Sequence, residues 1–307
     1  MNIIETHGLT RRFGRNEAVQ GLDLAVPEGS VCALLGPNGA GKSTTLKLLM
    51  NLLRPTSGSA RVLGVDSRKL GPAEFARIGY VSENQKLPMW MTVRQLLDYC
   101  RPFYPTWDRA LERQLLAQFS LPGERRLSHL SRGMLMKAAL LSSLAYRPTL
   151  LAMDEPFSGL DPLVRDELVR SLIEVSAAGE WTVLISSHDI EEVERMTDHV
   201  ALLDSGRLAL SEPAEALQAR FRRVEIDLEP DARETAPGVP MPAGWLEMQR
   251  SARRVTLVDS AFSARESEGL YRRHFPGSSV VAHPMTLREI FLTLARTHRQ
   301  DAKGAAA

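Results

Sequence analysis

The sequence predicts an α/β protein built around a mainly parallel sheet. Strand-like and helical segments alternate in the middle of the chain, at residues 149–153, 163–177, 182–186, 190–196 and 200–203. Such alternation is typical of a parallel sheet, because parallel strands need helical crossover connections. A glycine-rich loop also joins a strand-like segment at 30–35 to a helical segment at 45–50. Strand, glycine-rich loop and helix in this order predict a ligand site at the sheet edge.

Length and composition are those of an ordinary globular protein with room for a large domain and a smaller one. The chain has 307 residues, of which 44% are hydrophobic and 24% charged. A net charge of +1 predicts no overall attraction to nucleic acid or anionic lipid. Cys32 and Cys100 lack metal-site spacing, and we interpret both as structural residues of a reducing compartment. No signal peptide or membrane span is predicted, so we do not expect the chain to cross a bilayer by itself.

The remaining segments predict a division into two domains, 1–218 and 219–307. Short strands are expected at 2–7 and 21–26, and a helical subdomain at about 84–148, with helices at 93–99, 109–119 and 134–146. The tail after residue 219 has strand-like segments and a final helix, at 224–228, 254–258, 279–282 and 287–296. It also contains a Pro/Gly-rich passage at 230–244. We expect this tail to be a small α+β domain.

The glycine-rich loop has the spacing of a phosphate-binding P-loop, Gly36-Pro37-Asn38-Gly39-Ala40-Gly41-Lys42-Ser43-Thr44. Glycines allow consecutive backbone N–H groups to face a phosphate, and the following helix adds positive potential at its N-terminus. Lys42 is expected to reach the β and γ phosphate oxygens, and Ser43 to offer its hydroxyl to Mg²⁺.

A pair of carboxylates follows the apolar segment 150–153. At the end of a buried parallel strand, Asp154 is suited to support Mg²⁺, and Glu155 to polarise an attacking water molecule. Alone, such a pair decorates a helix start more often than not. Together with a P-loop, it predicts a catalytic site.

Further motifs resemble those of ABC transporter ATP-binding subunits over about residues 1–215. The segment Leu130-Ser131-Arg132-Gly133-Met134 resembles the ABC signature motif, and Ser158-Gly159-Leu160-Asp161 resembles the D-loop. His188 follows a predicted strand as the switch histidine does, and Phe13 is placed like the aromatic residue that stacks on adenine. For His188 the alternative is a capping or core histidine, for Phe13 a core aromatic, and for the D-loop a plain turn.

This resemblance implies a P-loop NTPase of the ABC ATPase type, with a mainly parallel core sheet, an antiparallel β subdomain and a helical subdomain. It implies that the chain hydrolyses ATP with Mg²⁺, using Lys42, Glu155 and His188. It also implies a composite site in which Ser131, Gly133 and Asp161 meet the nucleotide of a second copy, or of a homologous ATPase subunit. The other implied partner is a separate transmembrane permease, with no nucleic acid expected. The implied location is cytoplasmic and peripheral, on the inner face of the cell membrane.

Two motifs depart from the family pattern. The signature usually has glycine at its third place and glutamine at its fifth, where this chain has Arg132 and Met134. This form resembles subunits of ABC-2-type exporters. The expected Q-loop glutamine position holds Glu83, with Gln85 two residues later. Glu83 is a candidate Mg²⁺ ligand, because a carboxylate binds the metal or orients water, although its charge repels phosphate. The alternative is a solvated loop acid.

The sequence leaves other functions open. A soluble ABC ATPase acting on ribosomes or nucleic acid is the main alternative, although no tandem ATPase domain, coiled coil or zinc module is evident. A non-hydrolysing regulatory subunit is a further one, against which the retained catalytic residues argue. The basic run at 220–223 is interpreted as a solvated face rather than a lipid or nucleic-acid site. Residues 285–292 resemble the ending common in ABC-2 exporter tails.

Overall fold

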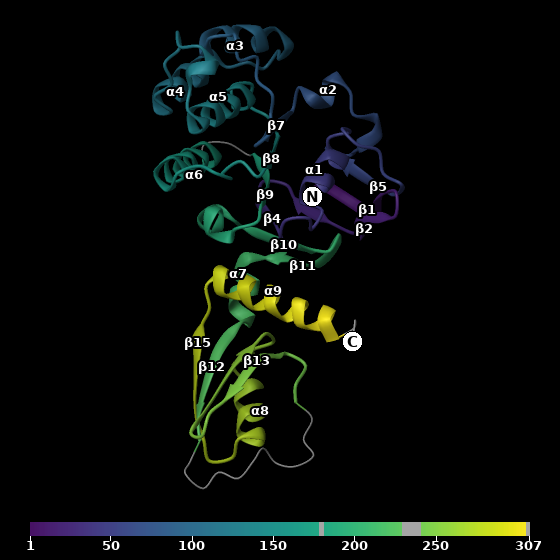
Figure 1. Ribbon diagram of the computed structural model, residues 1–307, viewed down its shortest axis with the longest axis vertical. Helices are drawn as coiled ribbons and strands as arrows, with labels where there is room; N and C mark the ends of the chain where they lie inside the picture. Colours follow the sequence, from purple (N-terminus) through teal and green to yellow (C-terminus); the bar gives the residue numbers. More distant parts are fainter. Residues whose placement is uncertain (178–180, 229–240, 305–307) are drawn as a thin grey trace. The chain divides into compact units, whose positions relative to one another are not determined.

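The chain folds into two compact units, Met1–Ser211 and Glu212–Ala307. The computed structural model describes residues 1–177, 181–228 and 241–304, and Figure 1 colours them along the chain. The sequence predicts a domain boundary between residues 218 and 219. The structure divides the chain earlier, because helix α7 (Ala214–Arg220) packs on helix α9 (Leu287–Gly304) of the second unit.

A six-stranded sheet forms the centre of the first unit. Its strand order is β11-β10-β4-β9-β8-β7, and the pairs from β10 through β7 are parallel. The strands are β4 (Val31–Leu35), β7 (Ile78–Ser82), β8 (Leu150–Asp154), β9 (Thr182–Ser187), β10 (His199–Asp204) and β11 (Arg207–Pro213). Every residue of β4, β8 and β9 is buried, as expected for a parallel sheet covered on both faces. The predicted mainly parallel core is confirmed.

An antiparallel sheet accompanies the core sheet. Its order is β2-β1-β5-β6, with β3 also paired to β1. The strands are β1 (Asn2–Phe13), β2 (Asn16–Leu22), β3 (Ala25–Pro27), β5 (Ser57–Val62) and β6 (Val65–Asp66). The strand predicted at 2–7 covers only the first half of β1, and the strand predicted at 21–26 spans the end of β2 and the start of β3. The β1–β2 hairpin was not predicted. Many of its residues are polar and only partly buried, so they show no clear apolar alternation, and the hairpin register shifts at bulges.

The helices of the first unit are α1 (Lys42–Leu49), α2 (Pro72–Phe75), α3 (Val93–Cys100), α4 (Arg109–Gln118), α5 (Arg132–Leu144) and α6 (Pro162–Ala177). Helix α5 packs on α3, α4 and β7, and Figure 1 shows α3, α4 and α5 gathered at one end of this unit. The expected helical subdomain is therefore present. Short 3₁₀ turns occur at Ser67–Lys69, Arg101–Phe103, Leu127–His129, Ile190–Glu192 and Glu194–Met196.

The helix expected at 190–196 is not an α-helix. It consists of two 3₁₀ turns that meet at Val193, whose backbone (φ −126°, ψ −11°) is not helical. The first turn is capped by the Asp189 side chain, which accepts a hydrogen bond from the Glu191 N–H at 3.0 Å. This segment follows His188, so its two short turns determine how the chain leaves the edge of the sheet.

The second unit is a four-stranded antiparallel sheet with helices. Its strand order is β13-β14-β12-β15, with bounds β12 (Arg222–Asp227), β13 (Trp245–Arg250), β14 (Arg254–Asp259) and β15 (Ser279–Pro284). Helix α8 (Ser267–His274) supplies Tyr271 to the core of this unit. The expected strands and final helix are confirmed, whereas β13 and α8 were not predicted. Residues 229–240 of the Pro/Gly-rich passage lie outside the described residues.

None of the helices that the structure describes is both long and apolar enough to span a membrane.

Asp259 is the buried polar centre of the second unit. Its side chain is 3% exposed and accepts hydrogen bonds from the hydroxyls of Tyr271 (2.5 Å) and Ser267 (3.1 Å). Burial and the neighbouring carboxylate raise the pKa of Tyr271, so its hydroxyl stays a donor. The carboxylate therefore ties β14 to α8.

We predict that Asp259→Ala lowers the unfolding free energy of the second unit by about 2–4 kcal/mol, because two buried hydroxyls lose their acceptor. Hydrogen exchange of peptides from β12 and β14, followed by mass spectrometry, measures this loss. Glu268→Ala is the control, since Glu268 contacts Arg272 on the exposed face of α8. Unchanged exchange in Asp259→Ala would contradict the structural role.

Candidate active site

Three parallel strands end together and bring the predicted motifs to one edge of the sheet. The P-loop follows β4, Asp154 ends β8, and His188 follows β9. The pairing register places Leu35 opposite Ser187, and Asp154 opposite Ser186. Residues far apart in the sequence therefore meet where ligands bind in parallel α/β sheets.

The P-loop is folded around the ammonium group of Lys42. This side chain is 5% exposed, and its Nζ donates hydrogen bonds to the carbonyl oxygens of Gly36 (2.7 Å) and Pro37 (3.2 Å). Gly41 has φ +103°, and a Cβ there would lie 2.4 Å from the carbonyl oxygen of Ala18. Only glycine fits this position, so the loop enters α1 in a conformation that depends on its sequence.

Asp154 is buried between two hydroxyl donors. Its Oδ1 accepts hydrogen bonds from Ser43 Oγ at 2.7 Å and from Ser186 Oγ at 2.9 Å. Ser43 and Asp154 thus meet as the sequence predicted. Ser186 was missed, because no motif contains it; its only signal was its place near the end of the next predicted strand.

Glu155 lies between Lys42 and His188. Its Oε1 is 3.1 Å from Lys42 Nζ, and its Oε2 is 2.8 Å from His188 Nδ1. The residue has φ +49°, an uncommon conformation for glutamate. Its backbone N–H donates to Ser186 Oγ at 3.0 Å, which holds this conformation in place. Backbone strain of this kind gathers at functional sites.

The hydrogen bond to Glu155 raises the pKa of His188 above its usual value, and the negative charges of Glu155 and Glu192 act in the same direction. Partial burial and the charge of Lys42 oppose the effect. The histidine therefore favours its charged form while it contacts Glu155.

Glu83 lies beside Asp154 through its main chain only. Its N–H donates to the carbonyl oxygen of Asp154 at 3.0 Å, but its carboxylate forms an ion pair with Arg132. Two of the three residues that depart from the ABC pattern, Arg132 and Glu83, thus contact each other, and nothing in the local sequence indicates this contact.

The signature segment forms the start of α5. Ser131 is its N-cap, with Oγ accepting a hydrogen bond from the Met134 N–H at 3.3 Å. Gly133 is buried, and a Cβ there would lie 2.6 Å from Val164 of α6. In the D-loop segment, Asp161 caps α6 by accepting from the N–H groups of Leu163 and Val164. The exposed Ser131 is not in contact with the P-loop of its own chain in any described hydrogen bond.

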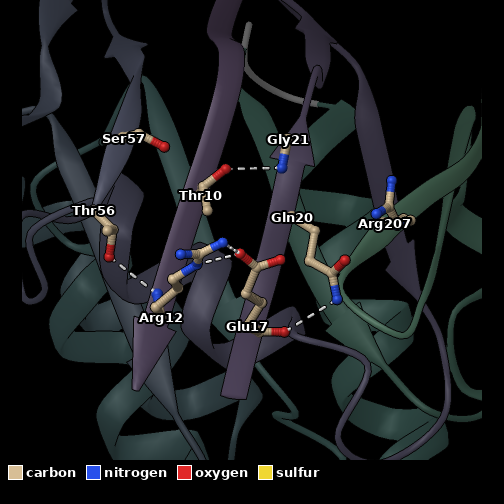
Figure 2. Close-up of a pocket in the computed structure, with 8 residues that line it drawn as sticks. All are labelled: Thr10, Arg12, Glu17, Gln20, Gly21, Thr56, Ser57 and Arg207. Carbon is tan, nitrogen blue, oxygen red and sulfur yellow. Dashed lines mark hydrogen bonds and ion pairs between the residues drawn. The ribbon is translucent and has the colours of Figure 1, made fainter. Parts of the chain in front are cut away.

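Phe13 ends β1 with 46% of its surface exposed, and the Arg11 guanidinium lies 4.6 Å from its ring centroid. The ring is therefore accessible at the surface of the antiparallel sheet. A pocket of about 550 Å³ lies between this antiparallel sheet and Arg207 of β11. Figure 2 shows the ion pair between Arg12 and Glu17 crossing the β1–β2 hairpin within it.

The cysteines take no part in the site. Cys32 is buried in β4, where burial raises its pKa to about 12, and Cys100 ends α3. Neither forms a disulfide. Within the described ranges, no group of three or more His, Cys, Asp or Glu side chains is arranged to hold a metal ion.

Comparisons with known proteins agree with this geometry. The ABC transporter family model matches residues 19–158. The daunorubicin/doxorubicin resistance ATP-binding protein DrrA of Streptomyces peucetius is 37% identical, over 95% of this chain and 92% of that protein. The daunorubicin resistance ATP-binding protein DrrA2 of Streptomyces coeruleorubidus is 31% identical, over 99% of this chain and 98% of that protein.

A solved ATP-binding subunit of an ABC transporter superposes with a TM-score of 0.64 and 27% identity, over 71% of this chain and 92% of that chain. These matches favour the transporter interpretation over a soluble ATPase acting on ribosomes or nucleic acid. The chain therefore belongs to the family of ABC transporter ATP-binding subunits, which are P-loop ATPases.

Proposed function

We propose that the chain binds and hydrolyses ATP as one half of a dimer, and that this cycle drives a separate membrane-spanning permease. The observation that carries the proposal is the contact of Lys42, Glu155 and His188 at the P-loop. It combines a phosphate-binding cation, a carboxylate suited to orient water and a titratable group within a few ångströms of one another.

The contacts around Glu155 suit the site as it is before ATP binds, which we call the resting site. Lys42 is buried and needs an anionic partner, which Glu155 supplies at 3.1 Å. ATP offers Lys42 its β and γ phosphate oxygens instead. Glu155 is then free to orient the attacking water and accept its proton, while His188 turns to the γ-phosphate. Phe13 stacks on the adenine, and the backbone of residues 36–44 faces the phosphates.

Ser43 and Asp154 fit a magnesium ion, because both present the hard oxygen atoms that Mg²⁺ prefers. They are already neighbours, joined by a 2.7 Å hydrogen bond. Mg²⁺ supplies positive charge that neutralises the phosphate oxygens during transfer. Glu83 joins this set only if its carboxylate leaves Arg132.

The signature segment supports a composite site. Ser131 and the N–H groups at the start of α5 form an anion receptor. A second copy of the chain, or a homologous subunit, brings its nucleotide to this receptor, with Gly133 and Asp161 beside it. Binding energy at two such sites closes the dimer, and hydrolysis allows it to open.

We further propose that the permease is an ABC-2-type exporter. Two relatives that align over nearly their whole length have names that state resistance to daunorubicin, and export is one means of resistance. The chain then works at the inner face of the cell membrane, where ATP is available.

Glu155→Gln is predicted to lower ATP hydrolysis at least about 100-fold, because an amide cannot accept the proton of the attacking water. ATP affinity stays within about twofold, since the phosphate contacts of Lys42 remain. Phosphate release and titration with a fluorescent ATP analogue measure the two effects. Lys42→Ala is the matched control that loses affinity. A Glu155→Gln rate above a tenth of the parent rate would show that another group acts as base.

The contact of His188 with Glu155 predicts a pH-dependent stability. The pKa of His188 is raised above 6.5 in the folded chain. The contact with Glu155 therefore adds its full share to the unfolding free energy below pH 6.5, and this share is lost as pH rises through the raised pKa. Urea unfolding of the parent chain and His188→Ala should therefore differ most below pH 6.5, and progressively less above it. The exposed His7 on β1 serves as the control site. A difference that grows with pH would contradict the contact.

The transporter proposal is tested by asking what the ATP-held chain binds. Tagged Glu155→Gln is isolated from detergent-solubilised native membranes with and without ATP, and its partners are identified by mass spectrometry. We expect one polytopic membrane protein in a near-equal amount. Recovery of only ribosomal or nucleic-acid-bound proteins would overturn the proposal in favour of a soluble ATPase.

A further inference from the structure

Two of the three residues that depart from the ABC pattern, Arg132 and Glu83, form an ion pair. Arg132 is the first residue of α5, and Glu83 follows β7, 49 residues earlier in the chain. Arg132 Nη2 donates to Glu83 Oε1. The usual residues at these two places, glycine and glutamine, carry no net charge together, and neither do Arg132 and Glu83.

Arg132 also lies against the D-loop segment. Gly159 has φ +66°, and a Cβ there would lie 2.4 Å from Arg132 Nη1 and 2.8 Å from its Cζ. The guanidinium therefore occupies the space that this glycine leaves open. Any other residue at 159 would both strain the backbone and displace the arginine.

Glu83 is in turn fixed to the catalytic edge. Its N–H donates to the Asp154 carbonyl oxygen at 3.0 Å, where β7 and β8 end side by side. A continuous series of contacts thus runs from Asp154 through Glu83 to Arg132. It connects the sheet edge at Asp154 to the start of α5, which carries the signature segment of the same chain.

The pair is poorly suited to a purely structural role. The side chains of Arg132 and Glu83 are 53% and 27% exposed, and an ion pair with this exposure contributes little to folding stability. The ion pair matters more for the geometry of the signature segment, because Arg132 lies between Ser131 and Gly133. Without Glu83, the guanidinium would be free to move at the start of α5.

We propose that Glu83 and Arg132 are positioning residues whose ion pair fixes the start of α5 to the segment after β7, so that closure presents Ser131 and Gly133 to the partner's nucleotide in one defined orientation. This inference rests on the proposed ATP-closed dimer. The pair acts on closure of the dimer and leaves ATP binding to the P-loop of its own chain unchanged.

The test measures ATP-dependent dimerisation of the full chain in the Glu155→Gln background by sedimentation velocity. Glu83→Gln and Arg132→Gln should each weaken the ATP-bound dimer at least about fivefold, which corresponds to about 1 kcal/mol. The double variant should bind its partner copy no more weakly than the single variant with the lower dimer affinity, because both substitutions remove the same contact. Binding of a fluorescent ATP analogue to the Arg132→Gln monomer should stay within about twofold of the parent.

A matched control uses another exposed ion pair in the helical region, Arg94–Glu124, whose nitrogen and oxygen are 2.7 Å apart. Arg94→Gln should leave dimerisation unchanged. The positioning role is overturned if the single variants stay within about twofold of the parent, if their effects add in the double variant, or if Arg94→Gln weakens the dimer equally. If the Glu155→Gln parent itself forms no dimer with ATP, the proposed function fails, and this inference fails with it.

Discussion

The whole site depends on the register of three parallel strands, β4, β9 and β8. Their hydrogen bonds place Leu35 beside Ser187, and Asp154 beside Ser186. A slip of one residue would turn the Asp154 side chain to the opposite face of the sheet. The register is well specified because every residue of these strands is buried, so a slip would disturb the packing of both sheet faces.

Burial of Lys42 makes the P-loop responsive to its ligand. A lysine that is 5% exposed requires compensation of its charge, and the carbonyl oxygens of the loop supply only part of it. Glu155 completes it. In the function that we propose, a triphosphate is a better partner for the same ammonium group, and its arrival releases the carboxylate. On this proposal, phosphate contacts of Lys42 replace its contact with Glu155, and Glu155 becomes available to orient water when ATP is bound.

Sequence reasoning predicted the parallel core and the P-loop because both leave strong local signals, namely apolar strands and glycines at fixed spacing. Ser43, Asp154, Glu155 and His188 lie close together in the structure, since strand ends at one sheet edge are neighbours, whereas their roles stay predictions. Sequence reasoning missed the polar β1–β2 hairpin, which lacks an apolar pattern, and α8, whose eight residues are mostly polar. Ser186 and the partner of Glu83 escaped because side-chain contacts between distant segments leave no trace in local spacing.

The pairing of Arg132 with Glu83 changes how each departure is interpreted. Taken alone, Glu83 places an additional negative charge near the phosphates, and Arg132 places an additional positive charge in the signature segment. As an ion pair, they restore neutrality and replace two small or uncharged groups with a directional contact. A departure from a family motif therefore need not indicate loss of the activity, because a second departure that lies far away in the sequence is able to compensate it when the fold brings the two side chains together.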